Sequence, residues 1–165
     1  MRRSDRARGR DFCYSVIDRC SHGVAALSTG TDTPFCLPLS LVRVDDRLYF
    51  HCAMSGRKTE LLRRCPNICI TFVAEDDPCF IPPREYTTFF KSVIASGTAV
   101  EVTDDEEKCM ALRALCKKLT PVAVSGDSFG LAIKESLAVT SVWRIDIKEL
   151  SGKEKPRPDA VQEVS

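Results

Sequence analysis

Residues 48–58 read Leu-Tyr-Phe-His-Cys-Ala-Met-Ser-Gly-Arg-Lys, and this stretch decides how the rest of the chain is interpreted. Its first residues predict a β-strand that delivers His51 at its end. A loop of small residues follows, and Gly56 precedes a helix predicted over residues 57–64, which begins with two cations. The stretch therefore places a histidine, a glycine and two positive charges within one loop of each other.

This arrangement suits a bound phosphate. The N–H groups of a first helical turn are unpaired, the helix dipole is positive there, and Gly56 lets a ligand approach the backbone. Arg57 can donate two parallel hydrogen bonds to phosphate oxygens, and Lys58 adds a compact charge. Because cations oppose the dipole at this end of a helix, an anionic ligand would explain them. The alternative is a solvent-exposed basic turn, with His51 merely ending a strand rather than bonding a bound ring or sugar.

The remaining pattern predicts a mainly β, antiparallel barrel with peripheral helices. Pro34 and Pro38 indicate an edge, a bulge or a bend in their strand, and Asp45-Asp46 a tight hairpin. Residues 75–86 are proline-rich and are expected to form a loop, while Thr103-Asp104-Asp105-Glu106 reads as a capping box. The expected strands are 24–28, 34–44, 47–51, 68–73, 87–102 (with Gly97 as a candidate break) and 139–147. The expected helices are 11–20, 57–64 and 104–119. Residues 122–138 are ambiguous apart from a helical turn or two near 129–135.

Length and charge exclude several classes of protein. The chain has 165 residues, enough for one domain over residues 1–153 with a flexible tail at 154–165. Twenty-four basic and twenty-three acidic residues give a net charge of +1, which argues against a dedicated nucleic-acid binder. No apolar run approaches the ~18 residues of a membrane helix, and the basic N-terminus lacks a secretory apolar stretch. We expect a cytoplasmic protein.

The nine cysteines form no metal-binding pattern. They include no C-x-x-C pair, and Cys36, Cys69 and Cys116 occupy positions that look apolar, as expected of reduced thiols that pack as small hydrophobes. A zinc site using Cys20 and His22 has unconvincing spacing, so no metal is expected. Cys52 is next to His51 in sequence, but strand neighbours face opposite sides, which disfavours a cysteine nucleophile.

The run from Pro34 to Lys58 resembles the FMN-binding split-barrel family related to pyridoxamine 5′-phosphate oxidase, and within it the nitroimidazole-resistance branch. Four further features carry the resemblance in the expected order: Met1-Arg2-Arg3, Pro38-Leu39-Ser40, Tyr86 to Gly97, and the closing Ile145-x-Ile147-x-x-Leu150-x-Gly152-Lys153. The most specific segment is His51-x-Ala53-x-x-Gly56-Arg57-Lys58. Together these features span most of residues 20–153.

The resemblance implies a homodimer of six-stranded split barrels with an FMN in each of two clefts between the subunits. The family's phosphate-binding positions fall on Ser55, Arg57 and Lys58. Other positions that the resemblance assigns to the cofactor cleft are Pro38, Leu39, Ser40, His51, Ser92, Val93 and, as a bordering aromatic or equally a core residue, Trp143.

The resemblance also implies an activity. Bound FMN would carry the redox chemistry, taking electrons from NAD(P)H or another donor and passing them to a small-molecule acceptor such as the nitro group of a 5-nitroimidazole. Residues 79–85 are irregular and do not support pyridoxamine-phosphate oxidation itself. Two alternatives stay open: a flavin carrier or sensor without turnover, and a haem protein with His51 or His22 as axial ligand. A deazaflavin is a further candidate cofactor.

Overall fold

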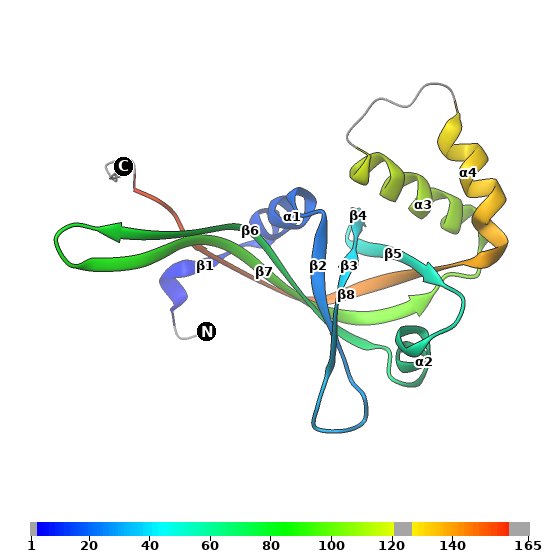
Figure 1. Ribbon diagram of the computed structural model, residues 1–165, viewed down its shortest axis with the longest axis horizontal. Coiled ribbons are helices and arrows are strands. Elements are labelled where there is room, and N and C mark those ends of the chain that lie inside the picture. Colours follow the sequence, from blue (N-terminus) through cyan, green and yellow to red (C-terminus); the bar gives the residue numbers. More distant parts are fainter. Residues whose placement is uncertain (1–2, 121–126, 159–165) are drawn as a thin grey trace.

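The computed structural model describes residues 3–120 and 127–158, whose eight strands all belong to one antiparallel sheet (Figure 1). The strand order is β3-β2-β6-β7-β8-β5-β4, with β1 paired to β8. The strands are β1 (Ala7–Arg8), β2 (His22–Leu27), β3 (Phe35–Ser40), β4 (Val42–Val44), β5 (Arg47–Ala53), β6 (Asn67–Ile81), β7 (Glu85–Glu101) and β8 (Thr140–Lys155). The helices are α1 (Arg10–Arg19), α2 (Arg57–Arg64), α3 (Asp105–Leu119) and α4 (Ser128–Ser136), with 3-10 turns at Ser4–Arg6 and Leu137–Val139.

The mainly β, antiparallel architecture with peripheral helices is confirmed. The described chain has eight strands rather than six, for two reasons. The strand expected over 34–44 divides at the buried Leu41 into β3 and β4, and two residues near the N-terminus pair with β8. The bend that the prolines indicated therefore turns the chain from one side of the barrel to the other.

Two hydrophobic clusters lie on opposite faces of β5, because alternate residues of a strand point to opposite sides. Phe50 belongs to the main core with Ile17 of α1 and Phe72 of β6. Tyr49 belongs to a second cluster, in which α3 and α4 cover the other face of the strand. The last residues of β5 thus stand between two packed regions.

The predicted loop over 75–86 is wrong. Strands β6 and β7 continue through it as a long hairpin that projects from the body of the molecule (Figure 1). Beyond Thr71, β6 pairs only with β7 and is an edge strand, so the missing N–H of Pro78 costs no hydrogen bond on its open side. The turn itself contains Pro82 and Pro83, the latter after a cis peptide bond.

Smaller differences concern the ends of elements. Asp104, not Thr103, caps α3, and its carboxylate accepts a 2.8 Å hydrogen bond from the Glu107 N–H. Strand β8 runs to Lys155, past the start of the predicted tail at 154, because the hairpin gives it a pairing partner in β7. The break considered at Gly97 does not occur, because β7 continues through it and only the register with β8 shifts there. Part of the ambiguous 122–138 stretch and the end of the tail lie outside the described residues.

Among the described residues, no helix is long and apolar enough to cross a membrane.

Candidate functional site

The stretch over 48–58 builds a cavity of about 310 Å³ where β5 ends and α2 begins. Both elements occupy the predicted places, since β5 ends at Ala53 and α2 starts at Arg57. Strand β3 supplies the opposite wall through its first residue. The lining residues are Phe35, Cys52, Ala53, Ser55, Gly56, Arg57, Lys58 and Thr59.

Gly56 gives this cavity an open backbone edge. It is the N-cap of α2 with φ 129° and ψ 170°, a conformation that is essentially restricted to glycine, and nothing lies within 4 Å of where a Cβ would be. No side chain caps the helix. The Thr59 hydroxyl donates to the Gly56 carbonyl at 2.7 Å, so it does not cover the N–H groups of the first turn. These groups remain available to an anion.

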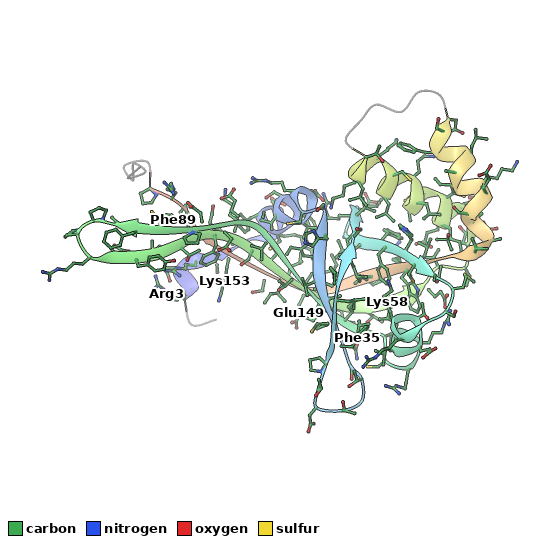
Figure 2. The ribbon with its side chains drawn as sticks, viewed as in Figure 1. Arg3, Phe35, Lys58, Phe89, Glu149 and Lys153 are labelled. Carbon is green, nitrogen blue, oxygen red and sulfur yellow. The ribbon has the colours of Figure 1, made fainter. Side chains whose placement is uncertain are left out.

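The two cations of the cavity rest on aromatic rings. The Arg57 guanidinium lies 4.4 Å from the centre of the Phe35 ring, and the Lys58 ammonium lies 5.2 Å from that of Phe50. Neither forms an ion pair with a carboxylate in the described part of the chain. Figure 2 shows Phe35 on β3 beside Lys58 on α2. An aromatic face holds a cation without cancelling its charge, so both charges stay available to a ligand.

Sequence reasoning missed both rings. Phe50 precedes His51 and reads as an ordinary core residue of its strand, and it is fully buried. Phe35 and Arg57 are far apart in sequence, and no local pattern links them. They come together because the end of β5, which leads into α2, lies next to the beginning of β3.

A partly solvated polar network fixes the loop that precedes α2. Arg63, in the last turn of α2, donates to both carboxylate oxygens of Glu101 at 2.8 and 2.9 Å and to the Met54 carbonyl at 3.2 Å. Ser141 on β8, which is buried, donates to the same carboxylate at 2.7 Å. The hydrogen bond from Arg63 lowers the pKa of Glu101. This network, also unforeseen from the sequence, ties the loop to the ends of two long strands.

His51 lies on the other side of β5 from Cys52 and lines a different cavity. This second cavity, of about 380 Å³, is formed mainly by apolar side chains of α3 and α4, such as Leu115 and Ile133. The ring is exposed at the surface of the single chain, but the atoms packed around it and the nearby Lys58 ammonium both lower the pKa of His51. The imidazole is therefore neutral near pH 7 and can donate or accept a hydrogen bond.

The remaining predicted residues divide into two groups. Pro38 and Ser40 of β3 are exposed on the outer face of the sheet, and Ser92 of β7 is half-buried. The side chains of Leu39, Val93 and Trp143 belong to the hydrophobic core. Trp143 thus takes the core position that was one of its two expected placements, and the assignment of Leu39 and Val93 to the cofactor cleft stays a prediction.

Trp143 instead packs against Phe50, the ring over which Lys58 lies. Its ring stacks on Phe50 with centroids 6.4 Å apart and planes 5° apart, and Phe50 in turn carries Lys58. Its buried Nε1–H has no hydrogen-bond partner in the described chain. The neighbouring Cys52 thiol lines the cavity, and burial raises its pKa, so it is a protonated thiol and not a nucleophile poised for attack.

The cysteines are free, as expected, but not all are buried. Cys13 and Cys20 lie in the core, whereas Cys36 and Cys69 are exposed on the outer face of the sheet. Successive residues of both strands alternate between the two faces of the sheet. The prediction that these two positions are apolar did not identify the face on which they lie. Within residues 3–120 and 127–158, no group of three or more His, Cys, Asp or Glu side chains is arranged to hold a metal ion.

The sequence profile of one family, described as pyridoxamine 5′-phosphate oxidase, matches residues 9–154. The chain belongs to the pyridoxamine 5′-phosphate oxidase family. The match includes the residues that line both cavities. Comparison with curated protein sequences gave no match.

Solved structures share the fold of this family member. A candidate 5-nitroimidazole antibiotic resistance protein from Bacteroides thetaiotaomicron has a TM-score of 0.75 and 23% identity, with 88% of this chain and 84% of that chain covered. The flavocytochrome Anf3 from Azotobacter vinelandii has a TM-score of 0.76 and 23% identity, with 99% and 75% covered. A FAD- and haem-binding protein from Mycobacterium smegmatis has a TM-score of 0.72 and 21% identity, with 92% and 75% covered.

Proposed function

We propose that this chain binds FMN, with the 5′-phosphate in the cavity at the start of α2, and acts as a flavin-dependent reductase. The observation that carries the proposal is the pair Arg57 and Lys58, two cations held by aromatic rings at an uncapped helix N-terminus. Such a pair is unfavourable beside the helix dipole unless an anion joins it. Two of the structurally similar proteins are named for flavin chemistry, one as a flavocytochrome and one as FAD- and haem-binding.

Each residue has a defined role in this proposal. Arg57 donates hydrogen bonds to the phosphate, Lys58 adds charge, and Ser55 and the first-turn N–H groups complete the binding of the anion. Pro38 and Ser40, with the backbone of Leu39, line the flavin ring. Ser92 and the backbone of Val93 belong to the same cleft. His51 offers a neutral imidazole to the ring, the sugar or the acceptor.

The flavin would supply the redox chemistry, accepting a hydride from NAD(P)H or another donor and passing electrons to a small-molecule acceptor. The chain's own part is to bind, orient and enclose. We propose a nitro compound of the 5-nitroimidazole type as acceptor, on the strength of the sequence resemblance and the likeness to the Bacteroides protein. We further propose that the working form is a homodimer with the cleft at its interface.

The decisive test is flavin retention by a charge-deleted variant. Arg57→Ala with Lys58→Ala should release the flavin and abolish binding of added FMN. The matched control is Lys117→Ala with Lys134→Ala, which removes the same charge from exposed positions of α3 and α4 and should bind FMN like the parent. Stoichiometric flavin in the first variant would refute the proposed site.

An absorption spectrum of the purified protein, followed by anaerobic NADPH, separates the candidate functions. A flavin spectrum that bleaches supports the reductase. A flavin spectrum that does not bleach with any donor favours the carrier. A Soret band would favour haem, for which the neutral His51 beside an apolar cavity is the candidate ligand.

A further inference from the structure

The long hairpin, here called the arm and defined as residues 75–90, is a two-stranded ribbon for most of its length. It consists of the end of β6 and the beginning of β7 and projects from the body of the molecule (Figure 1). Strand β2 pairs with β6 only as far as Thr71, and β8 pairs with β7 only from Phe90 onward. A two-stranded ribbon is marginally stable alone, and its open edges can pair with another chain. The arm is therefore a surface suited to a partner.

The tip of the arm presents two exposed aromatic rings. Phe80 and Tyr86 lie directly opposite each other across the ribbon, and they are 55% and 72% exposed. Tyr86 is on the same side of β7 as the exposed Ile94, because alternate residues of a strand share a face. The aromatic pair thus extends the side of the sheet on which Ile94 lies.

Strand β7 also relates the arm to α2. Arg63, in the last turn of α2, donates to both carboxylate oxygens of Glu101, so the helix is bound to the far end of the strand. Figure 1 shows the arm and α2 at opposite ends of β7. Tyr86 lies eight residues before Ile94 and Glu101 lies seven after it, about 26 Å and about 23 Å at ~3.3 Å per residue. Ile94 is therefore near the midpoint between the tip of the arm and the bound helix.

This midpoint gives a second copy of the chain two ways to pack on the face that carries Ile94. Sheets that pack face to face keep their strands roughly aligned, and a two-fold axis makes the contact the same for both copies. With the strands antiparallel across an axis at Ile94, each arm reaches the α2 end of its partner. With the strands parallel, arm lies on arm and α2 on α2.

The charges of the two elements favour the antiparallel arrangement. The arm has four carboxylates and one cation, whereas α2 has four cations and one carboxylate. Glu75, Asp77 and Glu85 have cationic neighbours on their own chain, but Asp76 is exposed and forms no ion pair in the described residues. The antiparallel arrangement brings the acidic element to the basic one, whereas the parallel arrangement places like charges together.

We propose that the arm of each subunit lies against α2 of its partner in a homodimer, and that Phe80 and Tyr86 close the partner's flavin site. The inference rests on the proposed function, because it takes the homodimer and the flavin site from it. Helix α2 has eight residues and is about 12 Å long at 1.5 Å per residue, so a tip at its last turn is close to the cavity at its first turn. The two rings then shield the bound flavin from water, which a single chain leaves open.

Photo-cross-linking of the full chain tests where the tip lies. Tyr86→p-benzoylphenylalanine should give, on illumination, a product of twice the chain mass, whose cross-linked peptides join the tip to α2 or to the loop before it. Leu131→p-benzoylphenylalanine is the matched control, because Leu131 is 67% exposed on α4 and should give no such product. Cross-links confined to one chain, or to another part of the partner, would overturn the inference.

FMN affinity, measured by quenching of flavin fluorescence, tests what the tip does. Phe80→Ser with Tyr86→Ser should weaken FMN binding on the order of tenfold, the scale of an aromatic ring stacked on a base, and should leave the dimer intact. Both side chains are exposed in the single chain, so the variant should fold like the parent. Unchanged FMN affinity would overturn the inference and leave the proposed function standing, whereas a parent that binds no flavin would overturn both.

Discussion

At the scale of single residues, the backbone conformation of Gly56 favours glycine over every other residue. Its φ of 129° and ψ of 170° fall in a region that costs other residues on the order of 1–3 kcal/mol. Gly56→Ala should lower the free energy of unfolding by about that amount, measured by urea denaturation, and should weaken FMN binding because the loop shifts.

Gly9 provides a matched control for that prediction. It is also a helix N-cap with open space at its Cβ position, but its φ is −74°, which any residue adopts. Gly9→Ala therefore reports the effect of alanine at a cap alone. If the two variants lose equal stability, the strain assigned to the backbone of Gly56 is absent.

The pKa of His51 is a second prediction at this scale. The atoms packed around the ring and the Lys58 ammonium both lower it, so Lys58→Ala should raise the pKa of His51 without restoring its usual value, because the packing around the ring remains. Binding of inorganic phosphate at Lys58 should raise it in the parent by the same electrostatic route. NMR titration of the two histidines measures this, with the His22 signals as internal control, and an unchanged His51 titration in Lys58→Ala would contradict it.

The lowered pKa of His51 also determines how the stability of the fold changes with pH. A lowered pKa in the folded state means that protons bind the unfolded chain more readily. The stability associated with neutral His51 is thus fully present above its unfolded pKa of about 6.5 and is lost as the pH falls from there through the folded value.

At the scale of elements, the Arg63–Glu101–Ser141 network joins α2 to the ends of β7 and β8. Glu101→Gln keeps the shape but removes the charge, and should cost about 1 kcal/mol at pH 7, since the pair is partly solvated. Because the pKa of Glu101 is lowered in the folded state, the stability that Glu101 contributes is present above about pH 4.5. It is lost as the pH falls through the pKa of the folded state.

Unfolding measured against pH therefore tests the network. The stability difference between parent and Glu101→Gln should shrink below pH 4.5. FMN affinity should also fall in the variant, since Arg63 would hold the Met54 carbonyl less firmly. A difference that is the same at pH 3.5 and pH 7 would show that the charge of Glu101 contributes nothing.

The observed strands and helices also show which parts of the fold could be predicted from the sequence. The strand, loop and helix over 48–58 could be predicted because each signal is local: a β-rich run, small residues, then a glycine before a helix. The long hairpin could not, since its prolines are compatible with an edge strand, and being at an edge is a property of the whole sheet. The two cations proposed to bind phosphate also belong to a local sequence pattern. The aromatic rings beneath them and the role of Glu101 depend instead on contacts between strands that are distant in sequence.

At the scale of the whole molecule, the outer face of the sheet carries an uncovered apolar patch. Val24, Val73 and Ile94 are 47%, 53% and 47% exposed, and strand pairing places Val24 and Ile94 on either side of Thr71. The patch borders proposed site residues, because Val24 is opposite Pro38 and Val73 is opposite Ser92. A homodimer that covers the patch would bring its partner to the cleft, which is what the proposed cofactor site requires.

Replacing Ile94 of this patch tests that arrangement. Ile94→Lys should convert the proposed homodimer to a monomer in sedimentation equilibrium and weaken flavin binding with it, since a buried unpaired ammonium is costly. Leu131→Lys is the matched control, because Leu131 is 67% exposed on α4, away from the patch, and should leave both properties unchanged. A parent that is monomeric yet holds flavin stoichiometrically would instead place the complete site within one chain, and Pro38, Ser40 and Ser92 would then have to enclose the ring without a partner.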